Sequence, residues 1–122
     1  MSIIVTDRGF TSDDWTGPVL DLPADTDPAT LAGHLGAPLI RIPFASFADG
    51  RGFTLARRLR LAGYKGRLRA QGHVIADQYT MARRAGFDEV EIDETLAARQ
   101  PQDQWLARAD WRPHSYQNRL RG

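Results

Sequence analysis

At 122 residues the chain is long enough for one domain with a substantial core and too short for two. Its composition, 42% hydrophobic and 25% charged with a formal net charge of +1, is that of an ordinary soluble globular protein. There is no cysteine, which excludes disulfides, thiol catalysis and cysteine-ligated metals or clusters. The N-terminal residues lack a signal-peptide pattern, and no run reaches the roughly 20 apolar residues of a membrane span. We therefore expect a soluble, cytoplasmic protein without membrane contact.

The first part of the chain predicts two strands and a helix. Residues 2–6 form a short β-branched run, and residues 18–22 give a second strand signal. Asp27 is placed as the N-cap of a helix with Pro28 at its first position, ending near Leu35.

Strands and helices then alternate. The apolar run at 38–44 predicts a strand, followed by a helix at about 53–62. The next strand is expected at 66–72, its helix at about 74–85, and a further strand at 88–93. Alternation of this kind indicates the α/β class, with a mostly parallel sheet of about four strands flanked by helices. An open wound sheet and a half-barrel fit this pattern equally well.

Two of the helices end in a similar way. Gly63 and Gly86 each follow an alanine, and each is followed by an aromatic residue, Tyr64 or Phe87. A glycine there can take a positive φ, and the next apolar residue packs back on the last turn. We therefore interpret both aromatic residues as cap contacts rather than ligand-stacking rings.

The pattern weakens toward the C-terminus. A short helix is expected at about 102–109. Residues 112–122 are polar, and we expect them to form an extended tail of the single domain at 1–122.

The basic side chains are concentrated in one block. Residues 51–84 carry nine basic side chains and one acidic one, whereas residues 1–50 carry two basic and seven acidic side chains. Two interpretations stay open: an anion-binding surface, or solvated helix faces that meet acidic neighbours within the fold.

An Asp-Gly-Arg-Gly turn begins this block. Glycines at 50 and 52 allow a tight turn with exposed amides, and a helix N-terminus follows. Arg51 lies at the end of a strand, where ligands of parallel sheets collect, and its guanidinium suits carboxylate, phosphate or sulfur oxyanions. Asp49 would orient Arg51 or cap the turn. We therefore expect Asp49, Gly50, Arg51 and Gly52 to bind an anion or an acidic partner surface.

A second group is expected at the same edge. Gln78 falls on the apolar face of the helix at 74–85 and needs hydrogen-bond partners there. Asp77 precedes it, again just after a strand, so both side chains are predicted to converge with Arg51, for binding or as a structural network. Arg69, inside a strand, either pairs with such a carboxylate or lies on an exposed edge. The three histidines have no metal-ligand spacing, so neither a metal nor a cofactor is expected.

A family resemblance covers residues 39–87 densely. The matching residues are Phe47, Asp49 to Phe53, Ala56-Arg57, Leu59-Arg60, Gly63-Tyr64, Gly66, Leu68 to Ala70, Gly72, Asp77-Gln78 and Arg84 to Asp88, with Tyr116-Gln117 near the end. In these residues the chain resembles domain-of-unknown-function family 934, bacterial proteins often encoded beside sulfite reductase in sulfate-assimilation operons. The resemblance implies a cytoplasmic role in sulfite or sulfate reduction, for which an oxidoreductase activity is often suggested.

Three functions remain open at this point. The first is a non-redox accessory protein that binds an oxyanion, or an acidic surface of a partner such as a sulfite reductase subunit, at the glycine turn. The second is a small enzyme that uses the same edge on a sulfur- or phosphate-bearing substrate; without cysteine, redox chemistry would need a borrowed cofactor or a partner. Nucleic-acid binding is weaker, because aromatic residues are not interleaved with the basic ones. A half-barrel would leave an uncovered edge, so a homodimer is also expected.

Overall fold

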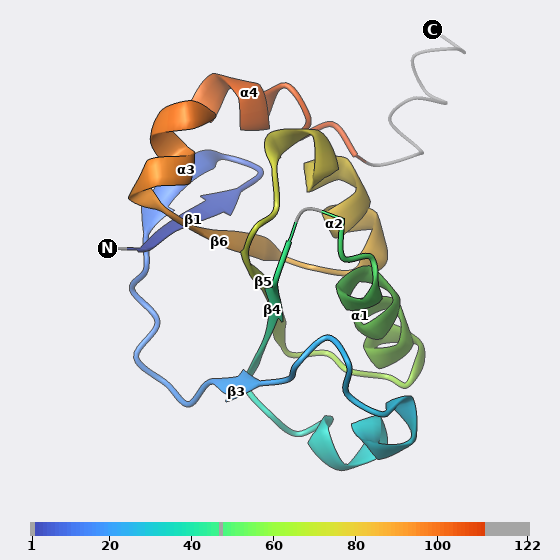
Figure 1. The fold of residues 1–122 in the computed structure, drawn as a ribbon. Helices are drawn as coiled ribbons and strands as arrows, with labels where there is room; N and C mark the ends of the chain where they lie inside the picture. Colours follow the sequence, from blue (N-terminus) through green and yellow to red (C-terminus); the bar gives the residue numbers. More distant parts are fainter. Residues whose placement is uncertain (1, 47, 112–122) are drawn as a thin grey trace, which may run out of the picture.

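The computed structural model describes residues 2–46 and 48–111, which form one sheet with its helices (Figure 1). The strands are β1 (Ser2–Thr6), β2 (Gly9–Ser12), β3 (Leu20–Asp21), β4 (Leu39–Phe44), β5 (Arg67–Gly72) and β6 (Glu89–Asp93). The helices are η1 (Pro28–His34), α1 (Arg51–Leu61), η2 (Ala76–Gln78), α2 (Tyr79–Ala85), α3 (Glu94–Arg99) and α4 (Gln102–Leu106), where η marks 3₁₀ helices.

The sheet has six strands in the order β2-β1-β6-β5-β4-β3. Neighbouring strands from β3 to β6 pair in parallel, while β1 is antiparallel to both β6 and β2. The predicted α/β class with a mostly parallel sheet flanked by helices is confirmed, but the number of about four strands is wrong. Five of the six strands overlap ranges that carry a strand signal in the sequence, and β2 lies outside all of them. Phe10 is its one large apolar residue, so its sequence carries little strand signal.

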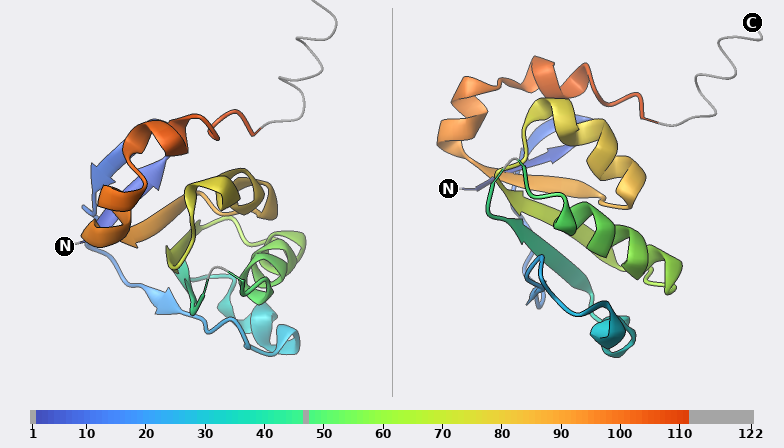
Figure 2. Two further views of the ribbon diagram at one scale, coloured as in Figure 1. Left: turned by 45° about the horizontal axis from the view of Figure 1, so that its top comes forward. Right: turned by 45° about the vertical axis from the view of Figure 1, so that its right-hand side comes forward.

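The parallel strands follow one another in chain order. Figure 2 shows η1, α1 and α2 on the same side of β4, β5 and β6. The parallel part therefore has no point at which the strand order reverses. In the part of the chain that the structure describes, its connecting helices all lie on one face of the sheet. Its carboxyl ends form one continuous edge, where ligands of parallel sheets usually bind.

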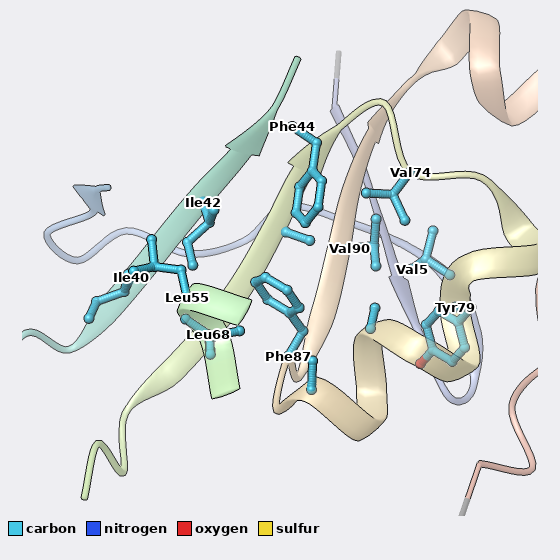
Figure 3. Packing of buried hydrophobic residues seen from close by; sticks show 14 of the residues in the cluster. Val5, Ile40, Ile42, Phe44, Leu55, Leu68, Val74, Tyr79, Phe87 and Val90 are labelled. Carbon is cyan, nitrogen blue, oxygen red and sulfur yellow. The ribbon is translucent and has the colours of Figure 1, made fainter. Parts of the chain in front are cut away.

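The hydrophobic core lies between the sheet and these helices. Alternate residues of β4, among them Ile42 and Phe44, face the helices and are buried (Figure 3). The Phe44 ring packs against those of Phe53 and Phe87, with centroids 4.9 and 5.9 Å away. Over β1 and β2 the same core is continued by Trp105 of α4, whose side chain is buried.

Both glycine caps form as expected. Gly63 and Gly86 have φ angles of 102° and 117°, and the amides of Tyr64 and Phe87 donate to carbonyls five residues back, at 3.0 Å in each case. This is the hydrogen bond of a Schellman cap. Both aromatic side chains are buried in the core, which confirms them as cap contacts.

The remaining helices differ in detail from the sequence-based expectations. Asp27 caps η1 as predicted, accepting from the amide of Ala29 at 2.9 Å, but the helix is 3₁₀ rather than α. The helix expected at 74–85 begins later, as η2 and α2, because Ile75 is extended. A helix that the sequence did not predict, α3, follows β6 directly and is capped by the carboxylate of Asp93. The predicted tail at 112–122 lies outside the described residues. Within the described ranges, none of the helices combines the length and apolar character needed to cross a bilayer.

Candidate functional site

The predicted turn lies at the carboxyl end of β4, where α1 begins. Arg51 is the first residue of α1, and its Nε and Nη2 donate to the two carboxylate oxygens of Asp49 at 3.0 and 3.2 Å. The amide of Arg51 also donates to Asp49, at 3.2 Å, so Asp49 both orients the guanidinium and accepts from the first turn of the helix. These hydrogen bonds lower the pKa of Asp49. The Arg51 side chain remains 65% exposed.

A groove of about 420 Å³ separates α1 from the loop that precedes η1. Arg51, Thr54 and Arg58 line it from α1, because residues three and four positions apart share one face of a helix. Asp25 lines it from the loop. The groove thus brings two guanidinium groups and a hydroxyl to one face of the 11-residue helix α1, with Arg51 and Thr54 in its first turn and Arg58 in its last. One carboxylate, that of Asp25, opposes them.

The two glycines of the turn act differently from the expectation. Gly50 has φ −80° and ψ −7°, which any residue can adopt, and nothing lies within 4 Å of where its Cβ would be. Gly52 lies within α1, and a Cβ there would come within 2.4 Å of the Phe44 ring. Gly52 is therefore needed for close packing of α1 on β4, not for a tight backbone turn.

Asp77 and Gln78 lie in η2, at the carboxyl end of β5. The Gln78 Oε1 accepts from the amide of Ile75 at 3.1 Å, so this side chain closes the start of its own helix. Asp77 is exposed and accepts from Arg108 at 2.8 Å, which ties the segment after α4 to η2. Asp77 and Gln78 thus have structural partners other than Arg51, and Arg51 is itself paired with Asp49.

Arg69 faces the other side of the sheet from α1 and is 2% exposed. Its guanidinium donates to three carboxylates: Glu89 at 2.6 Å, Glu91 at 2.9 Å, and Asp13 at 3.2 and 3.3 Å. Arg69 thus pairs with carboxylates rather than lying on an exposed edge, but its partners do not include Asp77. Because its nitrogens are bound to three carboxylates on that face, Arg69 does not join Arg51 at the carboxyl edge.

The face of the sheet opposite η1, α1 and α2 therefore carries a charged layer. Glu91 lies at its centre, with one oxygen accepting from Arg41 and Arg69 and the other from Ser2 and Gln71. The segment after β2 crosses this face, with Asp13 bound to Arg69 as described above. Burial raises the pKa of Glu91, but hydrogen bonds from Gln71, Arg69 and Ser2 outweigh it and hold the pKa below the ordinary 4.5. Glu91 thus stays charged as the common acceptor of the layer.

Stability should fall in acid because of this layer. The folded protein binds a proton at Glu91 less readily than the unfolded chain, so this stabilisation is complete above about pH 4.5 and is lost as the pH falls through the lowered folded pKa. Glu91→Gln should cost about 1–3 kcal/mol at pH 7, since Arg69 loses a charged acceptor, and should flatten the acid side of the profile. Thermal melts from pH 7 to pH 3 test this, with exposed Asp103→Asn as the control. An acid profile unchanged by Glu91→Gln would contradict it.

A second cavity lies at the carboxyl ends of β5 and β6, next to α3. It has a volume of about 350 Å³ and includes Gln71, His73, Glu91, Asp93 and Arg99 in its lining. Sequence reasoning missed most of these residues, because α3 gave no clear helix signal. The sequence did contain one signal for this cavity. Gln71, Gly72 and His73 lie at the carboxyl end of β5, the edge where ligands of parallel sheets usually bind.

Among residues 2–46 and 48–111, no group of three or more histidines and carboxylates is arranged to hold a metal ion.

Comparison with known proteins places the chain in a family without assigning an activity. No curated protein and no solved structure matches the chain. A family model described as "Bacterial protein of unknown function (DUF934)" matches residues 19–122, well beyond the 39–87 block of the resemblance. The chain therefore belongs to the DUF934 family of bacterial proteins of unknown function.

Proposed function

We propose that this protein is a non-redox accessory protein that binds an oxyanion, or an acidic group of a partner, in the groove at the start of α1. The observation that carries the proposal is the exposed Arg51 guanidinium, held in place by Asp49 beside Thr54 and Arg58. Arginine held in this way is suited to bind an oxyanion through its planar donors. The positive end of the α1 dipole favours negative charge at the same place.

Recognition is better supported than turnover at this groove. A general acid or base works best with a pKa near the working pH, whereas the pKa of Asp49 is lowered by hydrogen bonds from Arg51. Asp77 is ion-paired with Arg108. The groove thus offers charge and hydrogen-bond donors but no poised proton donor or acceptor among these residues.

Sulfite and sulfate are the oxyanions we propose first, and an acidic surface of sulfite reductase is the corresponding partner. The choice comes from the resemblance described above, which implies a role in sulfite or sulfate reduction. The groove itself would serve sulfite, phosphate or a carboxylate side chain, since all present oxygen atoms to a guanidinium.

Replacing Arg51 with alanine should weaken anion binding at least about tenfold, as expected for loss of a charged hydrogen bond. Calorimetric titration with sulfite, sulfate, phosphate and nucleotides measures this. Arg57→Ala is the matched control, because Arg57 is an exposed residue of the same helix that does not line the groove. The adaptor form is tested by mixing with purified sulfite reductase and comparing both variants. No saturable binding of any anion, together with no Arg51-dependent complex, would refute the proposal.

A further inference from the structure

The cavity at the ends of β5 and β6 is lined by one cation and one anion that have no ion-pair partner among the described residues. Arg99, in the last turn of α3, is exposed and has no ion-pair partner among the described residues. Asp93, the N-cap of α3, uses Oδ1 to accept from the amide of Leu96 at 2.8 Å, and within the same ranges its carboxylate has no cationic partner. The two charges line the same cavity without pairing with each other.

The third charged group of the lining is not available to a ligand. Each oxygen of Glu91 already accepts two hydrogen bonds, and the donors include Arg41 and Arg69. A ligand cation could reach Glu91 only by displacing one of these donors. The charge of Glu91 is therefore neutralised by its own partners in the protein. Arg99 and Asp93 are the charged groups that can bind a ligand.

The geometry of α3 sets the distance between these two groups. Asp93 and Arg99 are six positions apart in the chain, which corresponds to roughly 9 Å along a helix. Long side chains in a helix lean toward its N-terminus, so we expect the Arg99 guanidinium to lie nearer to Asp93 than the backbone spacing suggests. A ligand that bridges them needs an anionic and a cationic group only a few ångströms apart.

The rest of the lining is suited to a small polar molecule with a short side chain. Gln71 and Thr95 supply polar groups, and Ile92 and Leu96 supply apolar surface. Gly72 takes a φ of 98° and turns the chain so that His73 joins the lining. The His73 Nδ1 lies 3.1 Å from the carbonyl oxygen of Phe44, and because a carbonyl can only accept, this contact places the ring proton on Nδ1.

We propose that this cavity binds a small α-amino acid, with the ligand carboxylate on Arg99 and the ligand ammonium on Asp93. This site is separate from the α1 groove, and its occupation does not depend on the function proposed for that groove. A free α-amino acid carries its carboxylate and ammonium on one carbon, and a cavity of about 350 Å³ can accommodate it.

In the test, the full chain is titrated separately with L-alanine, L-serine, L-threonine and L-asparagine. Binding is followed by the shifts of its ¹H–¹⁵N NMR signals. Propionate and ethylammonium are the matched probes, because each is L-alanine without one of its two charged groups. We expect saturable shifts of the amides at 71–73 and 91–99 with at least one amino acid, and at least about tenfold weaker binding of either probe.

Two substitutions locate the site. Arg99→Ala should weaken binding at least about tenfold, with Arg57→Ala as the control. Asp93→Asn should do the same while preserving α3, because asparagine caps a helix as well as aspartate does; Asp103→Asn is its control. No shifts in these segments, propionate binding as tightly as L-alanine, or binding unaffected by Arg99→Ala would each overturn the proposal.

Discussion

Replacing Arg69 with alanine is expected to lower the free energy of unfolding by about 3–5 kcal/mol, the cost of breaking a buried ion pair by removing one partner. The side chain is 2% exposed and is bonded to Glu89, Glu91 and Asp13. Without it, the first two carboxylates remain buried with fewer donors. Urea denaturation at pH 7 measures the loss.

The controls separate charge from packing. Arg57→Ala, on the exposed face of α1, should change the free energy of unfolding by no more than about 0.5 kcal/mol. Combining Arg69→Met with Glu89→Gln should recover part of the loss, because the buried charge left behind is then smaller. A loss below about 1 kcal/mol for Arg69→Ala would show that water or a shifted side chain replaces the guanidinium.

Gly52→Ala is expected to destabilise the protein by about 1–3 kcal/mol, the usual cost of adding a methyl group to a filled core. The added Cβ would lie 2.4 Å from the Phe44 ring, so α1 or the ring must move. Because Arg51 and Thr54 sit on the same helix, a displacement of α1 should also weaken anion binding in the groove. Urea denaturation and calorimetry of the same variant measure the two effects.

Two further variants make this prediction specific. Gly50→Ala should be nearly neutral, because Gly50 has φ −80° and no atom within 4 Å of the added methyl group. Adding Phe44→Leu to Gly52→Ala should restore part of the stability lost by Gly52→Ala, since a smaller side chain relieves the overlap. If Gly50→Ala cost as much as Gly52→Ala, a backbone requirement of the turn would explain the motif instead.

Local patterns predicted most of the fold. The strands at 2–6 and 38–44 were predicted from β-branched or apolar runs, and those at 66–72 and 88–93 from their alternation with helices. The structure places a strand in each of these ranges. The caps at Gly63 and Gly86 follow from a backbone preference that acts within a few residues. Strand β2 and helix α3 were not foreseen. Strand β2 is held mainly by its pairing with β1, and α3 packs on β1 and β6, which are far apart in sequence.

The candidate site was less predictable, since it depends on which face of the sheet each side chain takes. Arg51 and Asp49 form an ion pair, and their separation of two positions in the sequence is enough to predict it. Arg69 was grouped with them, but its position in β5 directs it to the opposite face, toward carboxylates 20 and 22 residues away. The partner of Asp77, Arg108, is more distant still in sequence, and no local rule joins the two.

The hairpin of β1 and β2 precedes the region matched by the family model, yet it is integral to the sheet. Strand β1 pairs with β6 along its edge. The turn between β1 and β2 carries Asp7, which accepts hydrogen bonds from Tyr79, Arg83 and Trp111. Residues 19–122 alone would present β6 as an unprotected border and leave the Tyr79 hydroxyl without this acceptor. The part of the chain that matches the family model is thus shorter than the part that builds the sheet.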